Sequence, residues 1–223
     1  MDFASNPERF APSIANDRST APLILTVPGL NNSGPAHWQS AWERERGDIA
    51  RVELGGWARP HRNSWVNLLN LAIRRAGRPV ILVAHSLGCH AVAWWAAMER
   101  PAYGDPVVGA LLVAPPEVDV APVDERLKSF GPAPKEPLPF PSIVVASHDD
   151  PYIQFHRARR LAQFWGGRFA DAGAAGHINA DSNLGAWPFG QFLLRTLLGA
   201  AARSGEGDLG FAVSARQQPD LSL

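Results

Sequence analysis

The sequence predicts an α/β protein of one domain, with a mainly parallel central sheet of about six strands and helices on both faces. Short apolar runs rich in Val, Ile and Leu alternate along the chain with amphipathic helical patterns, which is typical of βαβ units. Within these runs polar residues do not alternate with apolar ones, as expected for strands buried on both faces. The length of 223 residues suits one well-buried core.

Four apolar runs predict the main strands, and two weaker runs predict the remaining ones. The four main runs are Leu23–Val27, Val80–Ala84, Val107–Ala114 and Ile143–Ala146. The two weaker runs are Ile49–Glu53 and Arg168–Ala170.

Five helical patterns lie between or after these runs. In chain order they are Pro35–Glu45, Ser64–Ala76, Leu87–Met98, Pro151–Trp165 and Trp187–Leu198. The second pattern is the clearest, because its apolar residues recur at the spacing of a single helical stripe. We expect Asn63 or Ser64 to cap the start of this helix and Gly77 to cap its end.

The two ends of the chain differ from its middle in composition. Residues 1–20 show no periodicity, and after Gly199 the chain turns to Ala, Gly, Ser, Glu and Gln. We therefore expect flexible tails over 1–20 and 201–223 around a domain at 21–200. The connection 115–141 is too short for a sizeable lid domain, although it has room for a short helix. This length predicts an open site without a large cap.

The charge balance and the cysteine count limit the partners and the compartment. Lys+Arg and Asp+Glu balance at 21 each, which gives no reason to expect nucleic-acid binding. No apolar run approaches the roughly 20 residues that cross a bilayer, so we expect no membrane insertion. The first 21 residues lack the apolar stretch of a signal peptide. Together with the single cysteine, Cys89, this predicts a cytoplasmic protein.

The strongest local pattern is Val80–Gly88, where an apolar run leads through Ala-His-Ser-Leu-Gly into a helical pattern. It matches the nucleophile-elbow motif G-x-S-x-G, with Ala84 in place of the first glycine. Small residues relieve the crowding of this sharp turn. The serine hydroxyl then lies at a helix N-terminus, where the dipole favours developing negative charge. The pattern predicts Ser86 as a nucleophile, while a serine that only caps the helix is the alternative.

A serine nucleophile needs a base, and the base needs an orienting acid. An acidic pair, Asp149 and Asp150, follows the run Ile143–Ala146, and His177 follows the last weak strand in a glycine-rich loop. The chain order Ser, Asp, His is that of α/β hydrolases. The pattern small-x-x-Asp favours Asp150 as the acid. Asp149 is its rival, and its alternative role is that of a solvated loop or cap residue.

Two other histidines lie close to these motifs in the sequence. His85 is expected to be a spacer in the elbow, with its side chain facing the sheet or the helix layer. His37 fits a position on a helix surface better than one in the pocket, because it falls within the predicted helix Pro35–Glu45.

The loop after the first strand is the expected source of one oxyanion donor. Gly29 allows the backbone to approach the substrate closely. The N–H groups of Leu30 and Leu87 are the predicted donors. Four further residues in or near these loops are expected to line the substrate pocket, together with Gly29. They are Asn31, Trp38, Trp57 and Trp187.

Metal chemistry has little support in the sequence, which contains neither H-E-x-x-H nor a paired-cysteine motif. His148, Asp149 and Asp150 offer ligand atoms, but adjacent side chains rarely point the same way. We expect no metal and no cofactor.

Five segments resemble the small cap-less serine hydrolases of the YdeN and retinoblastoma-binding-protein-nine type. They are Val27–Leu30, Gly34–Glu43, Ala84–Gly88, Ser147–Tyr152 and Gly176–Asn179. The similarity spans about residues 22–198. It implies a single domain of the α/β-hydrolase fold and a triad of Ser86, Asp150 and His177. Members of this family often have a more glycine-rich first loop than the Leu-Asn-Asn-Ser found here, a departure that concerns the second oxyanion donor.

The prediction that follows is hydrolysis of a carboxylic ester, thioester or amide in a small-molecule acyl substrate, through an acyl-enzyme on Ser86. One alternative is a binding protein that keeps the fold but has lost activity. Another is a C–C hydrolase or haloperoxidase-like enzyme. The order of the triad does not separate these enzymes, because function depends on the pocket.

Overall fold

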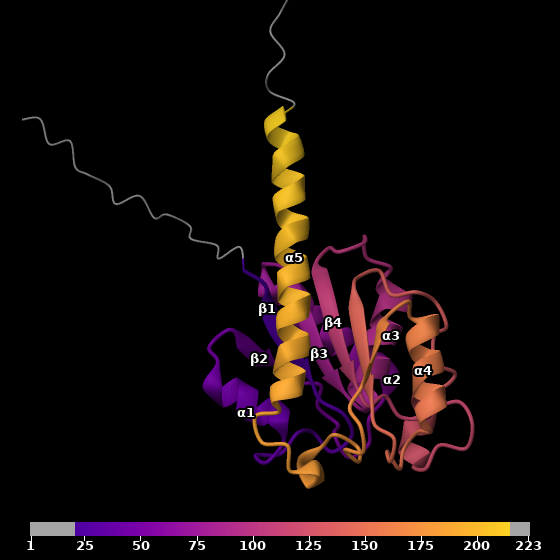
Figure 1. Ribbon diagram of the computed structural model, residues 1–223. Coiled ribbons are helices and arrows are strands. Elements are labelled where there is room, and N and C mark those ends of the chain that lie inside the picture. Colours follow the sequence, from indigo (N-terminus) through magenta and orange to yellow (C-terminus); the bar gives the residue numbers. More distant parts are fainter. Residues whose placement is uncertain (1–20, 215–223) are drawn as a thin grey trace, which may run out of the picture.

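The computed structural model describes residues 21–214, with side chains described as far as Arg203. Its centre is a wholly parallel six-stranded sheet in the order β2-β1-β3-β4-β5-β6 (Figure 1). The strands are β1 (Leu23–Val27), β2 (Ile49–Arg51), β3 (Val80–His85), β4 (Val107–Val113), β5 (Ser142–Ala146) and β6 (Arg168–Asp171). All six predicted strands are confirmed, and their ends differ from the prediction by no more than two residues.

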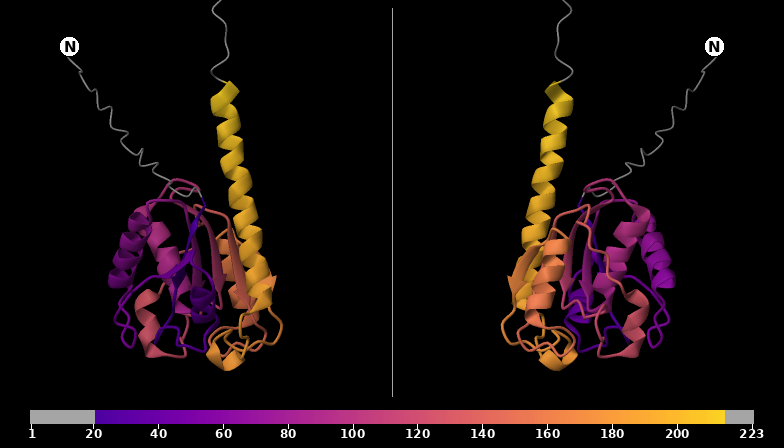
Figure 2. Two further views of the ribbon diagram at one scale, coloured as in Figure 1. Left: turned by 90° about the vertical axis from the view of Figure 1, so that its left-hand side faces the viewer. Right: turned by 90° about the vertical axis from the view of Figure 1, so that its right-hand side faces the viewer.

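Helices cover both faces of this sheet, as Figure 2 shows from two sides. One face carries α2 (Arg62–Ala76), α3 (Leu87–Glu99) and α4 (Phe155–Phe164), and the other carries α1 (Trp38–Glu45) and α5 (Pro188–Ser214). The side chains of a strand point alternately to the two faces. In β3, Leu82 therefore packs in one buried cluster with α2 and α3, while Ile81 and Val83 pack in the other with α1 and α5.

Four helices begin at other residues than the sequence predicted, although α5 differs by only one residue and begins at Pro188. Helix α1 begins at Trp38, because the His37 side chain accepts a hydrogen bond from the Gln39 N–H and caps the helix there. Helix α4 begins at Phe155 instead of Pro151, since the Asp150 carboxylate binds the Tyr152 N–H and holds the intervening residues in a turn.

Helix α2 begins at Arg62, so neither Asn63 nor Ser64 caps it. Its N-cap is His61, which makes no side-chain capping bond. The expected C-cap, Gly77, is confirmed by its left-handed backbone with φ of 62°.

Helix α5 is longer than predicted, since it continues to Ser214 instead of ending at Leu198. Ala200, Ala201 and Ala202 are strong helix formers, and no proline interrupts the chain between Pro188 and Pro219. Residues 201–214 of the tail expected over 201–223 thus lie in this helix. The tail expected over 1–20, and residues 215–223, lie outside the described residues.

Within residues 21–214, no large cap covers the C-terminal edge of the sheet. The connection between β4 and β5 carries one short 3₁₀ helix, η1 (Glu125–Phe130), within an otherwise irregular segment. Within the described part of the chain, no helix has both the length and the apolar character needed to cross a membrane.

The first turn of α3 lies against the end of β1 with no room for a side chain at Gly88. A Cβ atom on Gly88 would lie 2.3 Å from the carbonyl oxygen of Val27 and 2.7 Å from that of Pro28. Both obstacles are backbone atoms, which cannot move aside as a flexible side chain can. The glycine of the elbow motif therefore permits the contact between α3 and β1.

Replacing Gly88 by alanine should lower the free energy of unfolding by about 3 kcal/mol, the upper range for overpacking a well-packed core. Urea denaturation of the purified proteins measures the difference. Gly47→Ala is the matched control, since nothing lies within 4 Å of a Cβ atom at Gly47. Equal stabilities of the two variants would contradict this account of the contact.

Candidate active site

The backbone of Ser86 has an unusual conformation at the junction of β3 and α3. Its φ is 54° and its ψ is −127°, a region in which residues other than glycine are strained. The Ser86 N–H donates to the Val113 carbonyl on β4, which ties this turn to the neighbouring strand. This is the geometry expected of a nucleophile elbow.

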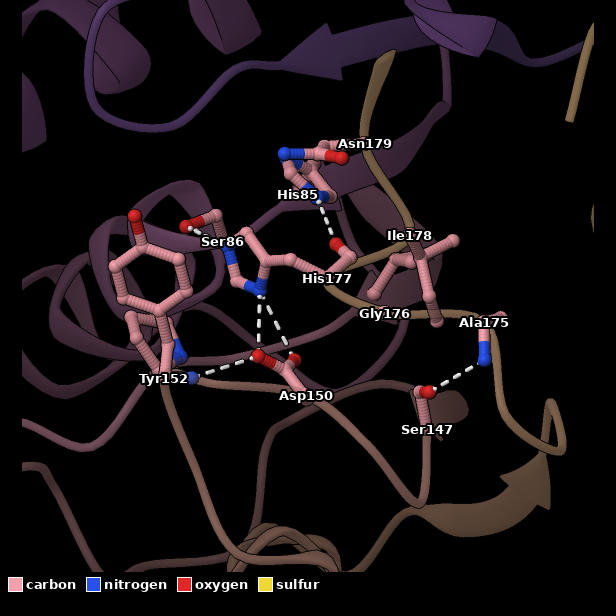
Figure 3. Close-up of polar contacts among 12 residues, drawn as sticks. His85, Ser86, Ser147, Asp150, Tyr152, Ala175, Gly176, His177, Ile178 and Asn179 are labelled. Carbon is pink, nitrogen blue, oxygen red and sulfur yellow. Dashed lines mark hydrogen bonds and ion pairs between the residues drawn. The ribbon is translucent and has the colours of Figure 1, made fainter. Parts of the chain in front are cut away.

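The three predicted triad side chains lie in one chain of hydrogen bonds, drawn in Figure 3. Ser86 Oγ lies 2.9 Å from His177 Nε2, and His177 Nδ1 lies 2.9 Å from each oxygen of Asp150. An ionised carboxylate only accepts hydrogen bonds, so Nδ1–H donates to Asp150 and Nε2 faces the serine as an acceptor. The Asp150 side chain is fully buried, while His177 is 8% exposed.

The neighbouring acid, Asp149, does not contact His177. One of its oxygens accepts hydrogen bonds from the Ser147 hydroxyl and from the Gly176 N–H. These two bonds hold the pKa of Asp149 below its usual value. Asp149 therefore shapes the loop that carries His177 and leaves Asp150 as the partner of the imidazole.

Four side chains from three segments hold the backbone of the His177 loop. Besides the bond from Asp149, Ser147 Oγ accepts from the Ala175 N–H at 2.8 Å. His85 Nε2 donates to the His177 carbonyl at 2.9 Å (Figure 3). Trp38 Nε1 donates to the Ile178 carbonyl at 2.8 Å. The position of the imidazole is thus set by the ends of β3 and β5 and by α1.

The three adjacent residues that offer ligand atoms, His148, Asp149 and Asp150, point to different partners. His148 Nε2 lies 2.9 Å from Asp171, while Asp149 binds the Gly176 N–H and Asp150 binds His177. Among the residues with described side chains, no group of three His, Cys, Asp or Glu residues is placed to hold a metal ion.

Gly29 lies directly beside the elbow. A Cβ atom on this residue would lie 2.7 Å from Ser86 Cβ and 3.1 Å from the Leu87 nitrogen. The absence of a side chain thus brings the loop after β1 into contact with the first turn of α3. Within residues 21–203, the N–H groups of Leu30 and Leu87 donate to no other protein group, so both are free to bind a substrate oxygen.

The partly buried side chain of Arg51 also supports the loop after β1. Arg51 donates to the Ser33 carbonyl at 2.9 Å and to Asn32 Oδ1 at 3.2 Å. It also pairs with Glu43 on α1 at 2.7 Å. Asn31 and Asn32 both have positive φ, of 62° and 65°, which asparagine tolerates better than most residues. The loop thus keeps its shape without the glycines that are frequent at this place in the family it resembles.

A hollow of about 310 Å³ opens beside Ser86. Its walls include the predicted residues Leu30 and Asn31, and η1 contributes Arg126 and Leu127. Several residues that line it were not predicted from the sequence, among them five with polar side chains. They are His37, Arg126, Tyr152, Asn179 and Asp181. Tyr152, whose ring centroid lies 4.4 Å from that of His177, belongs to the Asp-Asp-Pro-Tyr segment and was the one most open to prediction.

The three predicted tryptophans do not line this hollow, so those expectations were wrong. Trp38 and Trp187 are almost fully buried between α1 and α5, with ring centroids 4.8 Å apart. Trp57 packs against Trp65 beside α2, at a centroid distance of 5.6 Å. Large rings near a loop in sequence can fill the core beneath it, as Trp38 and Trp187 do here, while Trp57 is partly buried against the core.

His37 is buried beside the hollow instead of lying on a helix surface, as the sequence analysis expected. Its exposed fraction is 4%, and its ring contacts that of His85 at a centroid distance of 4.6 Å. Burial, with smaller contributions from the charges of Arg51 and His177, lowers its pKa to about 4. Because α1 begins at Trp38, His37 lies at the N-cap position, where its side chain turns inward.

A parallel sheet with an elbow serine, a carboxylate and a histidine at its strand ends, in that chain order, defines an α/β hydrolase. The serine hydrolase family matches residues 24–196, and the chain belongs to this family.

Two solved structures with similar chains are YdeN proteins. A YdeN-like hydrolase from Pectobacterium atrosepticum is 32% identical, with a TM-score of 0.71 over 82% of this chain and 92% of the other. The ydeN gene product of B. subtilis is 21% identical, with a TM-score of 0.65 over 80% of this chain and all of the other. The monoacylglycerol lipase of Paleococcus ferrophilus, 11% identical, shares the fold with a TM-score of 0.61 over 81% and 96%. Among curated proteins none matches.

The buried His37 should make the fold sensitive to acid. Its pKa of about 4 in the folded protein lies below the value of about 6.5 in an unfolded chain, so the unfolded state binds more protons between these values. Stability should therefore fall as the pH drops from about 7 to about 4, by about 3 kcal/mol from this residue.

His37→Asn isolates this contribution, because asparagine keeps a capping side chain on α1 but does not titrate. Urea unfolding at both pH values should show that the variant loses about 3 kcal/mol less than the wild type. His85 and His90, whose pKa values burial also lowers, are present in both proteins. Parallel losses in the two proteins would refute the role of His37.

Proposed function

We propose that this protein hydrolyses carboxylic esters, thioesters or amides through an acyl-enzyme on Ser86. The observation that supports this proposal is the unbroken hydrogen-bond chain from Ser86 through His177 to Asp150. A serine hydroxyl is a weak nucleophile at neutral pH, and an adjacent oriented base is what activates it.

In the first half of the reaction, Ser86 Oγ attacks the substrate carbonyl carbon while its proton passes to His177 Nε2. Asp150 keeps the imidazole in the required tautomer and stabilises the imidazolium that forms. The carbonyl oxygen becomes an oxyanion, which the N–H groups of Leu30 and Leu87 bind. As the tetrahedral intermediate collapses, His177 gives its proton to the leaving group.

In the second half, water enters the space that the leaving group has left. His177 takes a proton from this water, whose oxygen attacks the acyl carbon. The bond to Ser86 Oγ then breaks, His177 returns the proton to the serine, and a carboxylic acid leaves. Every proton transfer in the cycle uses the same imidazole nitrogen, which already lies 2.9 Å from the serine.

A fluorophosphonate probe should label the wild-type protein on Ser86 and should not label Ser86→Ala. The variant should also lose turnover of p-nitrophenyl acetate by about 10⁶-fold, as expected when a nucleophile is removed. Intact-mass spectrometry measures the label, and absorbance measures the turnover. Equal labelling of both proteins would overturn the assignment. A wild-type protein with neither labelling nor turnover would favour a binding protein that has kept the fold.

The two adjacent acids provide a matched pair of variants. Asp150→Asn should lower kcat by about 10⁴-fold, because an amide cannot hold the imidazole in the same tautomer or stabilise its charge. Asp149→Asn should retain most of the activity, since its amide oxygen still accepts the hydrogen bond from the Gly176 N–H. Steady-state kinetics on p-nitrophenyl acetate compare the two. The opposite ranking would make Asp149 the catalytic acid.

A further inference from the structure

Three hollows follow one another from Ser86 to the outer side of α4. The first hollow, beside the serine, shares Tyr152 with the second. The second and third hollows adjoin, because four residues line both of them. They are Glu117, Val120, Ile153 and Arg157. We propose that this row of hollows, the acyl groove, holds the acyl chain of an elongated substrate with an apolar middle and an anionic far end. This inference rests on the proposed hydrolysis at Ser86.

The middle of the acyl groove presents apolar side chains to water. Val120 is 60% exposed and Val123 is 66% exposed, and both line the second hollow together with the buried Ile153. Covering such side chains with an apolar chain removes apolar surface from water, which is favourable. An alkyl segment between the two ends of the substrate therefore fits this part of the groove.

The loop that carries these valines is held in place before any ligand binds. One oxygen of Glu117 accepts hydrogen bonds from the N–H groups of Asp119 and Val120, and its other oxygen pairs with Arg157 on α4. Asp119 accepts a hydrogen bond from the Ala133 N–H at 2.7 Å. The backbone at Val120 is thus held in place, and this wall of the groove is preformed.

The far end of the acyl groove is cationic. The third hollow, of about 270 Å³, includes three cations and two carboxylates in its lining. Arg157 is paired with Glu117, and Lys135 lies 3.8 Å from Asp119. Among the described side chains no carboxylate pairs with Arg160, whose guanidinium lies 5.3 Å from the Phe164 ring centroid. A carboxylate at the end of an alkyl chain complements this unpaired charge.

The acyl side of the substrate, and not the leaving group, is assigned to the groove for a chemical reason. The hydrolytic water must enter the space that the leaving group has vacated. That space has to open to solvent, whereas the acyl chain stays covalently held until the second half of the reaction. A walled groove that begins at Tyr152, beside His177, suits the part of the substrate that stays.

The proposal is tested with two esters whose acyl chains have the same number of carbons. They are the p-nitrophenyl monoester of sebacic acid and p-nitrophenyl decanoate. Their reacting ends are identical, so a difference in kcat/KM reports recognition of the far carboxylate. The wild type should prefer the sebacate ester by about tenfold, the worth of one hydrogen bond to a charged group. Arg160→Glu should abolish this preference and leave turnover of p-nitrophenyl acetate unchanged, because acetate does not reach α4.

Arg159→Glu is the matched control. It makes the same change of charge on the same helix, but the Arg159 guanidinium lies 4.9 Å from the Phe169 ring centroid and lines none of the three hollows. This variant should keep the preference. Raising the ionic strength should reduce the preference in the wild type, since salt screens an exposed charge pair.

Equal kcat/KM values for the two esters in the wild type would overturn the acyl groove, as would an equal loss of preference in both arginine variants. If these results came with normal turnover of p-nitrophenyl acetate, the proposed hydrolysis at Ser86 would stand without the groove. If the wild type did not turn over p-nitrophenyl acetate, the proposed function and the groove would fail together.

Discussion

The site depends above all on the backbone conformation of Ser86. A non-glycine residue in such a region costs about 1–3 kcal/mol, which the surrounding structure has to offset. The bond from the Ser86 N–H to Val113 and the close packing at Gly29 and Gly88 provide this support. The result is a hydroxyl at the end of the central strand β3, 2.9 Å from the imidazole that it needs. Contacts with β4 and with the end of β1, which two glycines make possible, thus offset the strain at Ser86.

The position of His177 has a different origin, because its loop lies beyond an edge of the sheet and has little regular structure of its own. Side-chain hydrogen bonds hold this loop in place of the backbone–backbone hydrogen bonds that a strand would make. Donors from α1 and the end of β3 bind the carbonyls of His177 and Ile178, and acceptors that follow β5 bind the two N–H groups just before His177. Asp150 accepts from His177 Nδ1 in the same region. The position of the proposed general base is therefore fixed by side chains that reach the loop from both layers around the sheet.

The sequence predicted the strands because a strand buried on both faces leaves a continuous apolar run, as in Val80–Ala84. It indicated Ser86 and Asp150 because each follows such a run, and His177 because it follows the weaker last strand in a glycine-rich loop. It failed for His37, whose inward position depends on α1 beginning at Trp38, a boundary that apolar periodicity does not define. It failed for Trp187 because the depth of a side chain depends on which helix covers it, and α5 covers this one. The sequence also offered no indication of Arg126, because this residue reaches the hollow from a chain segment that shows no periodicity.

The segments that hold the triad differ from those that form the outer walls of the hollows. Trp38, His85 and Ser147 fix the loop of the imidazole, whereas residues 117–127 and one side of α4 border the surface beyond Tyr152. Loops on a rigid scaffold tolerate insertion and exchange better than the elements they connect. The molecule is consequently modular in an evolutionary sense. Substitutions within residues 117–127 can therefore alter the surface beyond Tyr152 and leave the contacts that hold the proposed triad unchanged.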